Sequence, residues 1–374
     1  MSFLKDVRKD EKKLEESGIS IKSERPRYWI SVGNFLLNKI ISGKFRGGIG
    51  QGRIAGVTGP SSAGKSFIIG NICREAQEQG VGLLVLDSEN ALDDDFMNAL
   101  GVDTTRDDYV YRGVSTIPQA TVQVMNFLKS YRKHGETQPF LIVLDSIDML
   151  RTDSQAANYD KGDVKGDQGQ HAKQVKAMLA DWVHDIKSLN VSIVCTKQVF
   201  QEQDPMLQKN PQTAWKFTES AKYAFSQILL VTKFMLKDES GTKIPGKKDT
   251  IYAGIRLKAY GMKTRFTKPF QSASIEVPYE TGMDPYNGLL DAAKGMGVVT
   301  SSGSWNYFGD VKFQGDNGFD EHKEAILEAM IAKEGEFLED QTEGEIVEAS
   351  ESPADRRKRK LMEGMTEDEA DSDK

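Results

Sequence analysis

Eight consecutive residues have the spacing G-x-x-x-x-G-K-S, a pattern typical of phosphate-binding loops. They are Gly59, Pro60, Ser61, Ser62, Ala63, Gly64, Lys65 and Ser66. Glycines let the backbone turn its N–H groups toward phosphate oxygens, and the lysine ammonium reaches the β- and γ-phosphates. The serine hydroxyl is a ligand for Mg²⁺. The pattern alone could also be a chance glycine turn, so its surroundings decide its meaning.

Those surroundings favour a nucleotide site. The apolar run at residues 53–58 predicts a short buried strand directly before the loop. Residues 67–76 have apolar side chains at helical spacing, so a helix follows the loop. The N-terminus of such a helix adds a partial positive charge that stabilises phosphate. Strand, loop and helix together predict that the chain binds a nucleoside triphosphate with Mg²⁺.

Two further carboxylates could complete a hydrolytic site. Asp145 ends the apolar run 140–144, and a carboxylate at that place orients Mg²⁺ or its bound water. Glu89 follows the apolar run 82–86 and Asp87, where it can polarise the water that attacks the γ-phosphate. Alternatively, this stretch is a helix-capping cluster, because the three Asp residues at 93–95 could each cap a helix N-terminus. Capping there is compatible with Glu89 as the base.

The elements that must position these residues alternate along the chain. Apolar runs at 82–87, 140–145, 191–196 and 227–232 predict strands, and the intervals 117–133 and 170–188 predict crossover helices. Continuous apolar strands that alternate with helices are typical of an α/β fold with a largely parallel central sheet flanked by helices. Ligands of such sheets lie beyond the carboxyl ends of the strands, where the candidate residues fall.

The order of these motifs resembles the ATPase core of RecA-family recombinases. The phosphate loop is followed by D-S-E-N-A-L-D at 87–93, by L-I-V-L-D-S at 141–146 and by T-K-Q at 196–198. Residues 263–265 and 269–275 resemble the last core strands of that family, and 282–291 is similar to the phage branch typified by UvsX. The resemblance covers roughly residues 29–308 and implies a RecA-type P-loop ATPase core.

The resemblance implies further roles at the nucleotide site. Lys65, Ser66, Glu89 and Asp145 match the family's phosphate, magnesium and catalytic residues. The other matches are Asp93 and Phe96, which would contact adenine, Gln198, which would sense the γ-phosphate, and Lys263 and Arg265, which would reach a neighbouring subunit's ATP. For Lys263 and Arg265 a solvated basic turn is an equal alternative, because Lys258 and Lys268 lie close by in sequence.

Two segments are the candidates for DNA contact. The first, residues 151–170, is rich in Asp, Gly and Gln and leads into a predicted helix with Lys173 and Lys176 on one face. The second follows Gln198 and contains Lys209, Trp215, Lys216 and Phe217. Rings and cations together suit single-stranded nucleic acid. Alternatively, Trp215 and Phe217 are core residues at the start of a helix.

The domain organisation is predicted from composition and from the extent of the resemblance. We expect an N-terminal helical arm for oligomerisation at 1–28, the ATPase and DNA-binding core at 29–308, a short helical segment at 309–335 with one helix over 322–333, and an acidic tail at 336–374. From residue 334 to the end, fifteen acidic residues face six basic ones. The overall net charge of −7 therefore hides a body close to +2.

Composition also bounds the compartment. No apolar run is long enough to span a membrane, and the N-terminus is too charged for a signal peptide. Cys73 and Cys195 fall in predicted buried elements, which suits a reducing compartment. We expect a cytoplasmic protein without a membrane partner, located in the host cytoplasm if a phage encodes it.

The resemblance implies a DNA-dependent ATPase that forms a homo-filament on single-stranded DNA and exchanges strands with homologous double-stranded DNA. A single-strand-binding protein and a recombination mediator are its candidate partners. Two other functions stay open. One is a RecA-fold helicase or motor, although no helicase-type N-terminal domain is evident. The other is a DNA-binding accessory protein that uses ATP as a switch, although Lys65, Glu89 and Asp145 are all present.

Overall fold

The computed structural model describes residues 25–162, 169–209, 214–217, 219–237, 252–279 and 281–335. The described chain forms two compact units, of which the first ends at Gly288 and the second begins at Leu289. The sequence had suggested a later boundary, at residue 308. Most of the predicted N-terminal arm and all of the predicted acidic tail lie outside the described residues.

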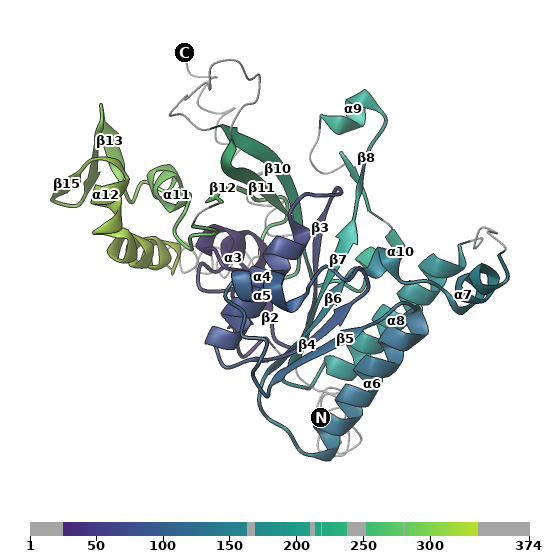
Figure 1. The fold of residues 1–374 in the computed structure, drawn as a ribbon. Helices are drawn as coiled ribbons and strands as arrows, with labels where there is room; N and C mark the ends of the chain where they lie inside the picture. The colour runs from purple at the N-terminus through teal and green to yellow at the C-terminus, as the bar shows by residue number, and fades with distance from the viewer. Residues whose placement is uncertain are drawn as a thin grey trace, which may run out of the picture. The chain divides into compact units, whose positions relative to one another are not determined.

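An eight-stranded sheet is the centre of the first unit (Figure 1). Six neighbouring strands are parallel, in the order β10-β3-β7-β6-β4-β5, and β11 and β12 extend this sheet in antiparallel pairing. Their bounds are β3 Ile54–Gly59, β4 Gly82–Asp87, β5 Tyr109–Gly113, β6 Phe140–Asp145, β7 Val191–Gln198, β10 Gln227–Lys237, β11 Tyr252–Thr264 and β12 Ser272–Pro278. The predicted α/β fold with a largely parallel sheet is confirmed.

Helices cover both faces of this sheet, because its central strands are apolar on both faces. In β4, Leu83 and Val85 belong to one hydrophobic cluster, whereas Leu84 and Leu86 belong to the other. The first cluster also contains residues of α3 (Phe35–Ser42) and α4 (Lys65–Glu78), and the second contains residues of α6 (Ile117–Lys133) and α8 (Gln170–Ile186). Figure 1 shows these two pairs of helices on opposite sides of the strands.

Shorter elements occupy the carboxyl edge of the sheet and its surroundings. The helix α5 (Asp94–Ala99) follows β4, and a 3-10 turn, η1 (Ile147–Met149), and α7 (Asp153–Asp160) follow β6. After β7 come β8 (Phe200–Gln201), α9 (Pro205–Gln208), β9 (Trp215–Lys216) and α10 (Glu219–Lys222). A small pair, β1 (Trp29–Ile30) with β2 (Ile49–Gly50), precedes β3. The segments expected to contact DNA therefore begin where β6 and β7 end.

The second unit differs in part from the expectation of one helix. It contains α11 (Leu289–Gly295), a three-stranded antiparallel sheet of β13 (Thr300–Ser302), β14 (Trp305–Phe308) and β15 (Val311–Phe313), and α12 (Gly315–Asp320). A helix over residues 323–335 follows, close to the one expected at 322–333. The strands have three or four residues each, which is too short for a hydrophobic period to identify them.

Within the described residues, every helix is too short or too polar to cross a bilayer. Cys73 and Cys195 are both buried, as the sequence had suggested, and both are free thiols.

Candidate active site

The phosphate loop connects the buried strand β3 to the helix α4, as predicted. Two of its glycines are required by the geometry. Gly64 has a φ of 91°, which L side chains rarely adopt, and a Cβ atom at Gly59 would lie 2.4 Å from the carbonyl oxygen of Val231. The helix starts at Lys65, so its first backbone N–H groups face the loop. This is the arrangement that binds an anion at a helix N-terminus.

Lys65 lies over the loop and close to carboxylates. Its Nζ donates a hydrogen bond to the carbonyl oxygen of Pro60 at 3.0 Å. Burial lowers the pKa of Lys65, and the charges of Asp145, Glu89 and Asp148 act in the opposite direction. The ammonium group therefore lies where negative charge is already concentrated, and a bound phosphate would add to that charge.

Asp145 ends β6 and lies beside Asp87, the last residue of β4. Burial raises the pKa of Asp145, whereas hydrogen bonds from the Thr196 and Ser66 side chains lower it. Its Oδ2 atom is buried and has no hydrogen-bond partner within the described residues. A buried carboxylate oxygen without a partner, next to the Ser66 hydroxyl, fits the oxygen ligands that Mg²⁺ prefers, directly or through water. Ser66 and Asp145 are thus the residues that would hold the ion.

Glu89 lies in the exposed loop after β4, and its carboxylate accepts a hydrogen bond from the Ser146 hydroxyl at 2.5 Å. Asp87 shapes this loop, because its two carboxylate oxygens accept the backbone N–H groups of Glu89 and Leu92, both at 2.9 Å. Ser146 follows Asp145 directly, so the candidate base and the candidate magnesium ligand are connected through one serine. An exposed carboxylate held in this way can contact a water molecule.

Gln198 is brought to the phosphate loop by strand pairing. It is the last residue of β7 and is opposite Gly59 in the parallel register of β3 and β7. Its backbone N–H donates to the carboxylate of Asp148 at 2.6 Å. The side chain of Gln198 therefore starts from the same edge of the sheet as the phosphate loop. The role of Gln198 as a sensor of the γ-phosphate stays a prediction.

Asp93 and Phe96 are on the first turn of α5. The Asp93 carboxylate accepts the backbone N–H of Phe96 at 2.8 Å, which makes it the N-cap of that helix. The capping interpretation of this cluster is thus confirmed, while contact with adenine stays a prediction. Phe96 is half-buried against the core.

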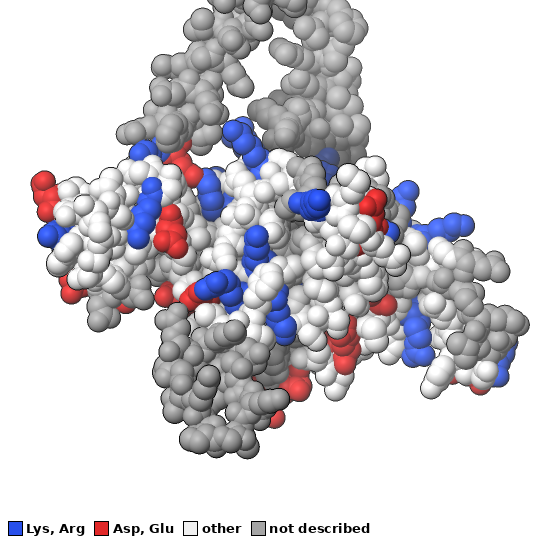
Figure 2. Space-filling model, turned by 90° about the horizontal axis from the view of Figure 1, so that it is seen from above, with Lys and Arg blue, Asp and Glu red and all other residues white. Residues whose placement is uncertain are grey.

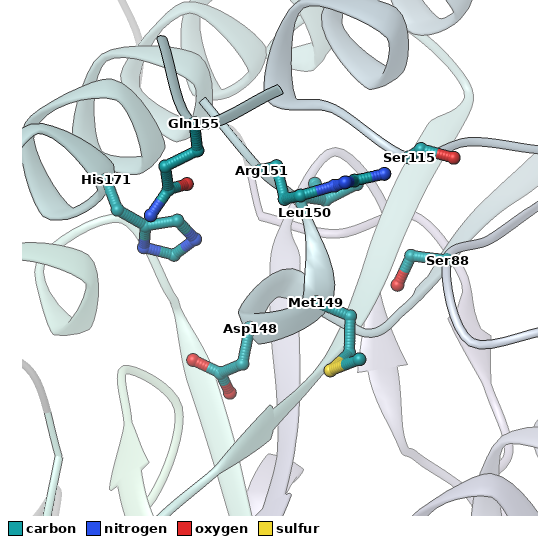
Figure 3. Close-up of a pocket in the computed structure, with 8 residues that line it drawn as sticks. All are labelled: Ser88, Ser115, Asp148, Met149, Leu150, Arg151, Gln155 and His171. Carbon is teal, nitrogen blue, oxygen red and sulfur yellow. The ribbon is translucent and has the colours of Figure 1, made fainter. Parts of the chain in front are cut away.

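A cavity of about 720 Å³ opens beside the residues that follow β4 and β6 (Figure 3). The segment after β6 supplies most of its lining, and Figure 3 shows Arg151 extended toward Ser115, with His171 and Gln155 side by side. The Arg151 guanidinium lies 5.3 Å from the centre of the Tyr159 ring. The lining residues are Ser88, Ser115, Asp148, Met149, Leu150, Arg151, Gln155 and His171.

Lys263 and Arg265 are not near the phosphate loop of their own chain. Lys263 is opposite Ile228 in β10, which in turn is opposite Gly56 in β3, three residues before the loop begins. Its ammonium donates to the carbonyl oxygen of Lys222 at 2.6 Å. Arg265 follows the end of β11, still farther from the carboxyl edge. Contact between these cations and ATP would have to come from another copy of the chain, and it stays a prediction.

The candidate DNA residues lie on or directly after three elements, α8, α9 and β9. Lys173 and Lys176 are exposed on α8, three residues apart. Lys209, at the end of α9, is exposed, and Lys216 on β9 pairs with Glu202 at 2.8 Å. Trp215 is half-buried, with its side chain against the core.

Phe217 differs from the expectation of a ring that faces DNA. It is 9% exposed and packs edge-on against Phe225, with 6.0 Å between the ring centres. The structure thus favours the alternative interpretation of Phe217 as a core residue, although it follows a strand, β9, rather than starting a helix. The apolar ring is buried because the second segment returns to the sheet at this point.

Several residues of the site were not identified from the sequence. Ser146 and Asp87 position Glu89, and Thr196 donates a hydrogen bond to Asp145. Asp148 and Lys197 form an ion pair beside Gln198. The one available signal in the sequence was their position, within or directly after the recognised motifs. Short polar residues are common at such positions, so this signal did not single them out.

Comparison with known proteins gives a consistent result. A family model described as the RecA N-terminal domain matches residues 22–284. Protein RecA of Aquifex pyrophilus is 27% identical over 317 residues, which cover 82% of this chain and 83% of the relative. Protein RecA of Thermus aquaticus is 27% identical over 269 residues, with 71% and 72% covered. Protein RecA of Clostridioides difficile is 28% identical over 276 residues, with 71% and 70% covered.

Proposed function

The chain belongs to the RecA family, and from this premise we propose that it is an ATP-dependent recombinase. It forms a helical filament on single-stranded DNA, takes up homologous double-stranded DNA and promotes pairing and strand exchange. The observation that carries the proposal is one edge of the sheet. The phosphate loop, the candidate base Glu89 and the candidate γ-phosphate sensor Gln198 lie at this edge, where the two candidate DNA segments also begin.

The chain's own residues account for ATP binding and hydrolysis. The backbone N–H groups of the phosphate loop and the Lys65 ammonium bind the β- and γ-phosphates. The Glu89 carboxylate, oriented by Ser146, polarises the attacking water and accepts its proton. When Mg²⁺ is bound, it neutralises charge on the phosphate oxygens, and Ser66 and Asp145 are the residues that hold it.

Single-stranded DNA is bound along the carboxyl edge. The segments after β6 and β7 begin there, with Lys173, Lys176 and Lys209 exposed. Figure 2, seen from above relative to Figure 1, shows Lys and Arg side chains on the described surface of this side, with Asp and Glu among them. Exposed cations bind phosphates regardless of sequence. The half-buried Trp215 could add base contact if the second segment rearranges.

Assembly completes the site. Lys263 and Arg265 lie away from the phosphate loop of their own chain, so they are proposed to reach the ATP of a neighbouring copy. A cation supplied in this way stabilises the transferred phosphoryl group and makes hydrolysis depend on assembly. Head-to-tail contacts of identical copies produce an open helical filament.

ATP hydrolysis with and without single-stranded DNA, measured beside joint-molecule formation with homologous duplex, tests the proposal. Stimulation by single strands together with homology-dependent joints is the expected result. Stimulation without joints would favour a motor or an accessory protein, and a heterologous duplex of equal length is the control.

A Glu89→Gln variant tests the assignment of the base. The amide cannot accept the proton of water, so we expect turnover to fall by about 10²-fold or more, while ATP affinity changes little. Unchanged turnover in a variant that binds ATP would show that another group is the base.

A further inference from the structure

An ion pair between a nearly buried lysine and a partly exposed aspartate connects the ends of β6 and β7. Lys197, the residue before Gln198, has a side chain that is 8% exposed, and its ammonium contacts the carboxylate of Asp148 in η1. An ammonium removed from water is stable in the fold when it is paired and hydrogen-bonded. The pair is thus a fixed connection between two segments that are 49 positions apart in the sequence.

Asp148 also binds the backbone of Gln198. Its Oδ1 atom accepts from Lys197 Nζ, and its Oδ2 atom accepts from the Gln198 N–H at 2.6 Å. Both oxygens of one carboxylate are therefore committed to consecutive residues of β7. Figure 3 shows Asp148 on the η1 turn, at the edge of the cavity, with Arg151 farther along the same segment. A displacement of this segment would move the backbone of Gln198.

Lys197 has a second contact, toward the second segment. Its Nζ lies 5.9 Å from the centre of the Phe217 ring, at cation–π distance. Phe217 is the point where that segment returns to the core. One lysine thus contacts the turn that leads into the first candidate DNA segment, through Asp148, and the end of the second segment, through Phe217.

We propose that the Asp148–Lys197 pair is a latch that holds Gln198 in register with both DNA-contacting segments, so that Lys197 is a positioning residue for DNA-stimulated ATP hydrolysis. The inference rests on the proposed function. Lys197 itself contacts neither ATP nor DNA in this assignment. Because the Lys197 ammonium is nearly buried, although Asp148 is 28% exposed, salt should screen the pair less than a fully exposed ion pair.

The test compares Lys197→Met, which keeps most of the length of the side chain without its charge, with Lys197→Arg, which keeps the charge. Lys129→Met, an exposed lysine on α6, is the matched control. Nucleotide binding and the ATPase rate are measured with and without single-stranded oligonucleotide. We expect Lys197→Met to lower the stimulation ratio at least tenfold while its DNA-free rate and ATP affinity stay within threefold. Lys197→Arg should recover most of the ratio, and Lys129→Met should equal the wild type.

A second pair of variants separates the latch from a general loss of structure. In Asp148→Asn the shape is kept and an oxygen can still accept from Gln198, but the charge is lost. If the two residues act together, the double variant Asp148→Asn with Lys197→Met loses no more stimulation than the more severe single variant. Additive losses would overturn the latch. A Lys197→Met protein with a lowered melting temperature and normal stimulation by DNA would also overturn the latch, because the pair would then contribute only to stability.

The two proposals fail in different ways. A wild-type protein whose ATPase ignores single-stranded DNA would overturn the proposed function and this inference with it. A stimulated wild type with equally stimulated Lys197 variants would overturn the latch alone.

Discussion

The Ser146 hydroxyl contacts the carboxylate that we assign as the base, and this contact sets the direction in which Glu89 faces. A hydrogen bond to a charged group contributes about 1.5–3 kcal/mol, and about 1.4 kcal/mol is a tenfold change in rate. We therefore predict that Ser146→Ala lowers kcat about tenfold with little change in KM for ATP, measured as steady-state hydrolysis with saturating single-stranded DNA.

Ser115→Ala is the control for that variant. Ser115 is an exposed serine near the same sheet edge and lines the cavity, but its hydroxyl is not in contact with Glu89. Its kcat should stay at the wild-type value. An equal loss in both serine variants would mean that the contact with Glu89 has no particular role.

Asp145 makes the stability of the nucleotide-free protein depend on pH. Burial raises its pKa above the usual value near 4, so in the window above pH 4 the folded protein keeps a proton that the unfolded chain has lost. Stability from this group is present below that window and is lost as pH rises through it. We predict that the free energy of unfolding of Asp145→Asn, relative to wild type, increases from pH 4 to pH 7.

Urea unfolding in the presence of EDTA, at several pH values, measures this difference. Mg²⁺ with nucleotide should reverse it, because the ion favours the ionised carboxylate of the wild type. A difference that is constant over the whole pH range would contradict a raised pKa at Asp145.

Single residues of the site were predictable where a local pattern specifies them. The phosphate loop, Glu89 and Asp145 follow apolar strands within a few positions, and Gln198 came from the family resemblance. Asp148 and Lys197 were not predictable, because their contact depends on β6 and β7 being neighbours in the sheet. Phe217 was predicted to contact DNA because aromatic and basic residues lie close to it in the sequence, but its ring is buried.

At the scale of elements, Asn34 joins α3 to a distant segment. Its side-chain oxygen accepts the N–H groups of Leu36 and Leu37 as the N-cap, and its amide donates to the carbonyl oxygens of Asp284 and Asn287. The residue is 1% exposed. We predict that Asn34→Ala lowers the free energy of unfolding by about 1–3 kcal/mol, since both the helix N-terminus and the two carbonyl groups lose a hydrogen-bond partner.

Asn34→Ser separates the two contributions, because its hydroxyl can cap the helix but cannot reach both carbonyl groups. Thermal or urea unfolding should place this variant between the wild type and Asn34→Ala. Equal losses in the two variants would assign the whole effect to the contacts with 284 and 287.

Elements with long apolar periods were predictable almost to the residue. The strands β4 and β6 and the helix α6 have the predicted bounds. The strand β10 is longer than predicted, because Lys233 interrupts the apolar run on which the prediction was based. Antiparallel pairing with β11 extends it nonetheless. The strands β13 to β15 are too short to carry a signal.

At the scale of the whole molecule, the sequence predicted a parallel sheet but not its order. The order β10-β3-β7-β6-β4-β5 places β3 and β7 side by side. In the sequence, 131 residues lie between Gly59, the last residue of β3, and Val191, the first residue of β7. That adjacency is what brings Gln198 to the phosphate loop. Alternation of strands and helices cannot specify it, because each crossover can pass one strand or several.

Charge is the other property of the whole chain, and it divides unevenly. The region from residue 334 onward has fifteen acidic and six basic residues, and the rest of the chain is close to +2. An acidic segment tethered to a basic surface competes with DNA for that surface. Deletion of residues 336–374 should therefore strengthen binding to a single-stranded oligonucleotide, by about three- to tenfold at low salt, where exposed charges are least screened.

Fluorescence anisotropy of a labelled oligonucleotide measures the effect, in the presence of a slowly hydrolysed ATP analogue. The measurement is made at about 50 and at about 300 mM salt, between which the Debye length shortens about 2.5-fold. The gain in affinity should shrink at the higher concentration, because ions screen tail and DNA alike. A variant with residues 356–360 changed from basic to neutral, in the full-length chain, is the control for the basic cluster that the deletion also removes. If the deletion weakens binding, and this variant weakens it equally, the cluster binds DNA and the acidic residues do not compete.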